Sequence, residues 1–274
     1  MIPMWSFIKT LFERFMRHEI PDLAAQLSFY FLLSLFPFLL FAITLLAYLP
    51  LSTDYVLFMI GQYVPMESTD LVEENIRRVL DVQRPELLSF SLLFALWSAS
   101  HGSYAIMRAL NRAYDVEEER SFLRARVVAV LLILGMFVVF LVALILPVFG
   151  RALGLALFNV VGLSDEFLRM WHVIRWWISL FVIVLVFMYL YILAPNTTLR
   201  LREVWIGAVV AAMGWHLISL GFSYYVDNFA NFTAMYGGIG GVVVFMLWLY
   251  LAGMMLLLGG EINSTLKLIR RSGS

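Results

Sequence analysis

Hydrophobic residues run through this chain in long blocks that short polar segments separate. Six blocks contain about 20 or more mostly apolar residues, the length that an α-helix needs to cross the hydrocarbon core of a bilayer. The pattern predicts an all-α membrane protein with six transmembrane helices in a single polytopic domain, residues 1–274. The predicted spans are residues 27–49, 87–107, 127–149, 174–194, 203–226 and 237–260.

Residues 4–18 follow a different pattern, typical of an amphipathic helix that rests on a membrane surface. Pro21 is expected to end this helix, and Asp22 to cap the first span. Two further short amphipathic helices are predicted in the first outer loop, near residues 54–64 and 70–82. The apolar face of the first helix contains Met4, Ile8, Leu11 and Phe15, with Trp5 and Phe12 beside it, and the opposite, polar face contains Lys9, Glu13 and Arg17.

Composition and charge restrict the class of protein further. Hydrophobic residues make up 62% of the chain and charged residues only 14%, about half the usual share of a soluble domain. The net charge is zero, which gives no basic footprint for nucleic acid. Cysteine is absent, which removes disulfides and thiolate chemistry. The expected partners are therefore membrane lipids, with a homo-oligomer or an envelope protein as a further possibility.

Lysine and arginine residues are distributed unequally between the two sides of the predicted spans. Thirteen flank the spans on the side of the termini, and six lie on the other side. Because cytoplasmic loops carry the excess of basic residues, both termini are predicted to be cytoplasmic. The expected location is the cytoplasmic (inner) membrane of a bacterium, with several crossings.

The second predicted span carries a stripe of polar and aromatic side chains within an arc of roughly 80°. Such residues usually line a bundle interior or a wet cavity, although Arg108 could snorkel to headgroups and His101 could bond a neighbouring carbonyl. The stripe contains Trp97, His101, Tyr104, Arg108 and Asn111. Small residues on a neighbouring face predict close helix packing: Ala95, Ser98, Gly102, Ala105 and Ala109.

A second polar stripe runs along the fifth predicted span and reaches the outer surface. Hydrogen bonds between helices would account for it equally well. If both stripes face one cavity, they form a polar track across the bilayer, with His101, Arg108 and Asn111 in its inner part. The second stripe contains His216, Ser219, Ser223 and Asp227.

The ends of other spans supply weaker candidates for a headgroup or packing site. Glycines that open a helix leave N–H groups uncovered, which favours an anion, although close packing is the commoner reason for them. Asp22 and Glu261 are expected near the cytoplasmic interface, where they could pair with Arg108 or Arg112 or remain solvated. The segment 195–198 predicts a helix stop and a tight turn. The candidates are Asp22, Gln26, Tyr236, Gly237, Gly238 and Glu261.

Enzymatic chemistry finds little support in the sequence. No two of the four histidines are spaced as metal ligands on a helix, and no nucleophile elbow or nucleotide-binding motif is present. The sequence therefore predicts a protein that is not an enzyme and has neither a metal nor a cofactor.

Three ordered segments make the chain resemble the YihY / virulence-factor BrkB family of bacterial inner-membrane proteins. They are residues 22–31, which Pro37 follows, residues 97–102 with 111–114, and residues 236–263 with their Gly-Gly-Glu-Ile-Asn ending. The resemblance implies six transmembrane helices, cytoplasmic termini and movement of lipids or lipid-like precursors. It also implies that a former ribonuclease label of the family is a misassignment. His101 is a departure from this resemblance, because the family has a variable, often basic, residue at that position.

Three functions are compatible with these observations. The favoured one is a transporter or flippase-like protein for a lipid or lipid-like amphiphile with a polar, anionic headgroup. A proton-coupled transporter of a small solute or ion, with histidines as proton carriers, is an alternative. A scaffold in an envelope assembly, with the loop 51–86 as its contact surface, is the other.

Overall fold

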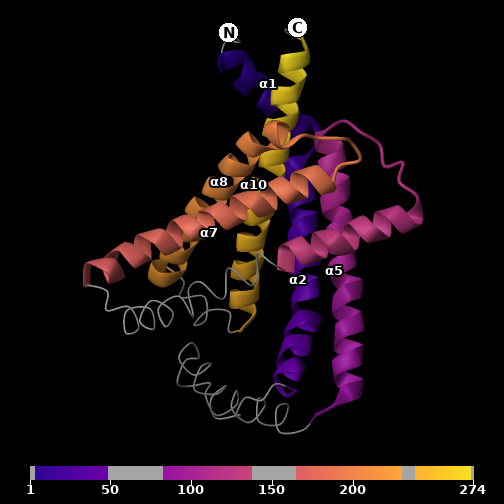
Figure 1. The fold of residues 1–274 in the computed structure, drawn as a ribbon, viewed down its shortest axis with the longest axis vertical. Coiled ribbons are helices and arrows are strands. Elements are labelled where there is room, and N and C mark those ends of the chain that lie inside the picture. The colour runs from indigo at the N-terminus through magenta and orange to yellow at the C-terminus, as the bar shows by residue number, and fades with distance from the viewer. Residues whose placement is uncertain (1–3, 49–82, 138–164, 230–237, 273–274) are drawn as a thin grey trace. The chain divides into compact units, whose positions relative to one another are not determined.

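The computed structural model describes residues 4–48, 83–137, 165–229 and 238–272. In this part of the chain all regular structure is helical, as the hydrophobic pattern predicts. A further helical stretch covers residues 122–137. The helices are α1 (Met4–Arg17), α2 (Ile20–Leu46), α5 (Pro85–Ala113), α7 (Asp165–Leu193), α8 (Leu201–Phe229) and α10 (Gly238–Ser272) (Figure 1).

The chain divides into two compact units. Unit 1 combines Met1–Phe29 with Ser103–Ser274, and unit 2 is Tyr30–Gly102. In unit 2, the C-terminal part of α2 lies beside the N-terminal part of α5, and a Cβ at Gly102 would touch the ring of Phe31. In unit 1, α10 packs along α8, α8 packs along α7, and α1 packs against α10 (Figure 1).

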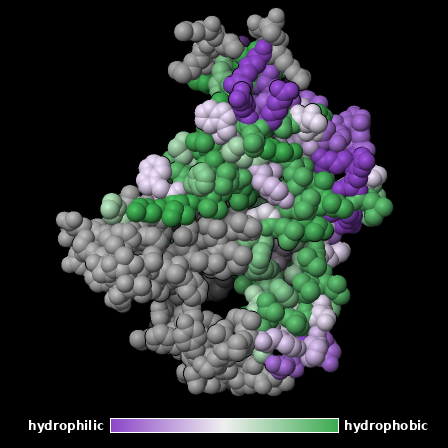
Figure 2. All heavy atoms as spheres, viewed as in Figure 1, coloured by the Kyte–Doolittle hydropathy of each residue, from purple (hydrophilic) through white to green (hydrophobic). Residues whose placement is uncertain are grey.

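Four helices are long and apolar enough to cross a membrane. They are Ile20–Leu45, Trp176–Leu193, Leu201–Val226 and Gly240–Arg270. Many large apolar side chains on these helices point outward, as they do where lipid replaces water as the solvent. Within unit 1, hydrophilic residues gather at the end that carries α1 and the last turns of α10 (Figure 2). The helical fold is therefore confirmed for the described residues.

The count of six spans and the cytoplasmic placement of the termini stay predictions. The second predicted span lies within α5, a helix that is more polar than the four candidate spans. The third is helical over residues 122–137 and then leaves the described part of the chain. The two amphipathic helices predicted at 54–64 and 70–82 lie outside the described residues as well.

Several helix ends differ from the prediction. Pro21 does not end α1, because α1 ends at Arg17 and α2 already begins at Ile20. Asp22 therefore lies in the first turn of α2 instead of capping it. Glu19, with a φ of 53°, makes the turn between the two helices. The stop predicted at 195–198 is confirmed, since α7 ends at Leu193 and α8 begins at Leu201.

The largest difference concerns α10, which continues through Glu261 to Ser272 where the prediction ended a span at residue 260. Hydropathy alone ends the span at the first charge, but a helix continues wherever its side chains find partners. Glu261 is completely buried, and so are its neighbours Asn263 and Thr265. Residues 261–265, where the polar part of α10 begins, are therefore part of the packed interior of unit 1.

Candidate functional site

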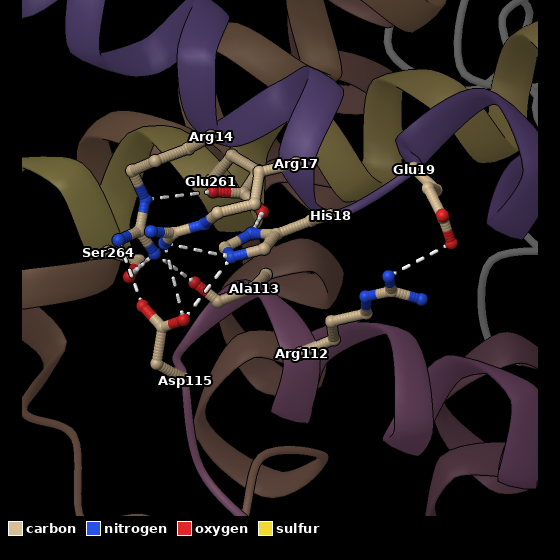
Figure 3. A network of polar contacts seen from close by, with 9 residues as sticks. All are labelled: Arg14, Arg17, His18, Glu19, Arg112, Ala113, Asp115, Glu261 and Ser264. Atoms are coloured by element: carbon tan, nitrogen blue, oxygen red, sulfur yellow. Dashed lines mark hydrogen bonds and ion pairs between the residues drawn. The ribbon is translucent and has the colours of Figure 1, made fainter.

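Arg14 is the centre of a buried polar cluster in unit 1. The first helix places Arg14 on the face that packs against α10, and the side chain is only 5% exposed. Its guanidinium donates to Glu261 Oε2 at 3.2 Å and to Ser264 Oγ at 2.9 Å, both on α10. It also donates to Asp115 Oδ2 at 2.9 Å and to the carbonyl oxygen of Ala113 at 2.8 Å (Figure 3). A single side chain thus joins three segments of the chain.

His18 completes the cluster one turn after Arg14. Its Nδ1 lies 2.5 Å from Glu261 Oε1 and donates to it, because a carboxylate can only accept. Its Nε2 lies 3.2 Å from both Asp115 Oδ1 and Arg17 Nη2 (Figure 3). We call this set the Arg14–Glu261 cluster; its members are Arg14, Arg17, His18, Asp115, Glu261 and Ser264, with the Ala113 carbonyl.

The charges in the Arg14–Glu261 cluster balance. Two arginines face two carboxylates when His18 is neutral, and both oxygens of Glu261 are paired inside the protein. No group of three or more His, Cys, Asp or Glu side chains in the described part of the chain could hold a metal ion. The Arg14–Glu261 cluster therefore has a structural role, because it holds α1 and the turn after α5 against α10.

Asn111, near the end of α5, also joins separate segments of the chain. Its side chain is buried, its Nδ2 donates to Glu118 Oε2 at 2.9 Å, and its Oδ1 accepts from the backbone N–H of Asn196 at 2.6 Å. Arg120 donates to the carbonyl oxygen of Ala194 at 3.0 Å in the same region. These bonds hold the loop after α5 against the turn after α7, which favours a structural role for Asn111.

The other residues of the α5 stripe have different surroundings. His101 donates from Nδ1 to the carbonyl oxygen of Trp97 at 2.9 Å, and its ring packs on Tyr30 and Trp97. Arg108 is exposed and makes no hydrogen bond or ion pair with the described residues. Tyr104 lies one turn before Arg108 on α5, and the guanidinium of Arg126 lies 5.1 Å from the centre of its ring. The neighbouring small residues are buried, which confirms the predicted packing face.

The α8 stripe is largely occupied by packing contacts. His216 is buried, with Nδ1 3.0 Å from the carbonyl oxygen of Ala212 and its ring against Trp176 and Trp215. Ser219 accepts from Trp248 Nε1 on α10 at 3.2 Å. This is the hydrogen bonding between helices that the sequence left open as an alternative. The side chain of Asp227 lies outside the described part.

Of the remaining candidates, Asp22 and Gln26 are exposed on the first turns of α2, and Gly238 is the first residue of α10. Tyr236 and Gly237 lie outside the described residues. Neither alternative for Glu261 holds, because it is fully buried and pairs with neither Arg108 nor Arg112. Glu261 pairs with Arg14 and His18, and Arg112 pairs with Glu19 at 2.9 Å.

Sequence reasoning missed Arg14, His18 and Asp115 as partners of Glu261. Arg14 had a signal, because it falls between the apolar and the charged face of the first helix, one turn before His18. Asp115 had none, since its place depends on the turn after α5, where its φ is 51°.

Long apolar helices, with the Arg14–Glu261 cluster buried at one end of unit 1, are the features of an integral membrane protein. A sequence model of the family described as virulence factor BrkB matches residues 11–273, so the chain belongs to that family. It is 52% identical over 261 residues to the "Putative ribonuclease-like protein YfkH" of Bacillus subtilis, covering 95% of both chains. It is 26% identical over 264 residues to a "UPF0761 membrane protein" of Tolumonas auensis, covering 95% of this chain and 85% of the relative.

Other relatives are longer than this chain. A "UPF0761 membrane protein" of Chromohalobacter salexigens is 28% identical over 275 residues, which cover 97% of this chain and 64% of the relative. No solved structure matches the chain.

Proposed function

We propose that this protein moves a lipid or lipid-like amphiphile with an anionic headgroup through the bacterial cytoplasmic membrane. The observation that carries the proposal is the exposed Arg108 on α5, one turn from Tyr104, over which Arg126 is stacked at 5.1 Å. The ring of Phe122 also lies under Arg126, at 5.3 Å. Two guanidiniums and two aromatic rings thus share one surface, and aromatic and basic side chains are typical of headgroup level.

Arg108 has no hydrogen bond or ion pair with the described residues, whereas several other arginines of unit 1 are paired. Arg14, Arg112 and Arg120 are each taken up by carboxylates or carbonyl oxygens. A guanidinium donates two parallel hydrogen bonds to a phosphate, which makes Arg108 suited to a phosphate-bearing headgroup. The acyl chains would then stay in the bilayer, next to the apolar outer surface of the candidate spans.

We also propose that the protein is not an enzyme, so that the ribonuclease-like name of the Bacillus relative does not extend to this chain. His101 and His216 each bind a carbonyl oxygen of their own helix, and His18 belongs to a charge-balanced cluster. Among the described residues, neither His101 nor His216 is paired with a second acid or base, as general acid–base cleavage of RNA would require. The burial of His216 between tryptophan rings also disfavours it as a proton carrier.

Reconstitution into liposomes of phosphatidylcholine and phosphatidylglycerol, with fluorescent phosphatidylglycerol as the probe, tests the transport function. The protein should expose inner-leaflet probe to an added quencher faster than empty liposomes do. Arg108→Ala should slow this movement roughly tenfold or more, because a charge-assisted hydrogen bond of about 1.5–3 kcal/mol is lost.

Arg202→Ala is the matched control, since Arg202 is an exposed arginine at the start of α8, and it should leave the rate unchanged. If Arg108→Ala moves lipid as fast as the parent protein, the headgroup site is wrong. If the parent protein does not exceed empty liposomes, the transport function itself is wrong for this lipid class.

A further inference from the structure

The first helix presents three distinct faces, and only one of them is buried against α10. Arg14 and His18 lie on the face that is docked on α10. A second face is polar and carries Lys9, Glu13 and Arg17, all exposed. The third face is apolar and points outward, with Trp5 78% and Phe12 65% exposed, and Ile8 and Met16 also exposed.

The outward apolar face matches the predicted one only in part. Ile8, with Trp5 and Phe12 beside it, is exposed as the pattern allows. Leu11 and Phe15, which the pattern placed on the same face, are half-buried in the structure. Docking through Arg14 and His18 turns α1 so that Trp5, Ile8, Phe12 and Met16 face outward together. These four side chains fall within an arc of about 80° on the helix, so they form one continuous apolar strip.

The link to α2 fixes where this strip can lie. Only His18 and Glu19 separate α1 from α2, whose apolar stretch Ile20–Leu45 is long enough to span a membrane. His18 donates to Glu261, and Arg14 pairs with both Glu261 and Asp115, so α1 cannot swing away from this end of the spanning helix. A helix in that place lies at the boundary between headgroups and acyl chains, where tryptophan is enriched.

Charge pairing shows which force would hold α1 in the lipid. Lys9 lies 3.8 Å from Glu13, and Arg17 lies 3.4 Å from Asp115, so the polar face is compensated within the protein. Attraction to anionic headgroups is therefore weak, and the apolar strip has to supply the interaction. We propose that Trp5, Ile8, Phe12 and Met16 are inserted into the acyl chains of one leaflet, independently of lipid charge, while the Arg14–Glu261 cluster fixes the angle of insertion.

Single-cysteine spin labels test this directly, because the chain contains no native cysteine. The full-length variants F12C and E13C, which differ by one position on α1, are reconstituted into phosphatidylcholine vesicles with and without phosphatidylglycerol. Collision rates with oxygen and with a water-soluble nickel chelate give the depth of each label. The Phe12 label should lie about 5–10 Å below the headgroups, and the Glu13 label should stay in water, in both vesicle types.

Each other result overturns the proposal. Equal exposure of both labels to the nickel chelate would mean that the strip is in water. Insertion only with phosphatidylglycerol would make the contact electrostatic. Spin–spin broadening between Phe12 labels, lost on dilution with unlabelled protein, would mean that a second copy of the chain covers the strip. Because this assay needs no transport, its result is independent of the function proposed above.

Discussion

Replacing Glu261 by alanine is expected to destabilise the folded protein by about 3–5 kcal/mol, the cost of removing one partner from a buried ion pair. Glu261 is fully buried, and its two oxygens pair with Arg14 and His18. Without it, the guanidinium of Arg14 remains buried and keeps only Asp115 as an opposite charge. Unfolding in mixed micelles, followed by circular dichroism, measures the loss.

Glu13→Ala is the matched control, because Glu13 is an exposed carboxylate on α1 that pairs with Lys9 at 3.8 Å. An exposed pair of this kind contributes about 0.3–0.5 kcal/mol, so the control should unfold almost as the parent does. If both substitutions lowered the free energy of unfolding equally, the Arg14–Glu261 cluster would not stabilise the fold more than an exposed ion pair does.

A double-mutant cycle with Arg14→Met separates the ion pair from the general cost of changing α10. Arg14→Met and Glu261→Leu should each destabilise the protein, but the double variant should lose less than the sum, because no charge is then left unpaired between them. Strict additivity would show that Arg14 and Glu261 act independently, contrary to the 3.2 Å contact between them.

The elements that the sequence predicted well are those marked by a long run of apolar residues or by residues that stop a helix. The apolar blocks of α2, α7, α8 and α10 are recognisable because a bilayer demands about 20 apolar residues at each crossing. The turn after Leu193 is recognisable because proline and asparagine disfavour a continued helix. The end of α10 was missed, since a buried polar helix has the same composition as a solvated loop.

The candidate site was harder to predict, because its partners lie far apart in the sequence. Arg14 and Glu261 are separated by 247 positions, and nothing in either segment names the other. Charge counting placed both near one membrane face, which limits the possible partners without choosing among them. Asn111 was correctly singled out as unusual, but a lone polar residue in an apolar helix reads the same whether it binds a ligand or a backbone N–H.

Replacing Gly207 by leucine is expected to destabilise the protein by about 3 kcal/mol or more, because α8 and α10 have no room for a side chain there. A Cβ at Gly207 would overlap the backbone oxygen of Gly259 and the amide of Asn263. That amide accepts from the N–H of Gly207 at 2.8 Å and donates to the carbonyl oxygen of Val204 at 3.0 Å. Separating the helices would leave all these groups without partners in an apolar interior.

Gly221→Leu supplies the control on the same helix, since a Cβ at Gly221 would meet nothing within 4 Å. There the substitution removes a flexible residue from a helix and should stabilise the protein by up to about 1 kcal/mol. The two variants change the same residue type on α8 by the same number of atoms, so opposite signs isolate the effect of packing against α10. If Gly207→Leu unfolds in mixed micelles like the parent, the close approach of α8 and α10 does not exist in the folded protein. In that case Asn263 must be satisfied by another partner.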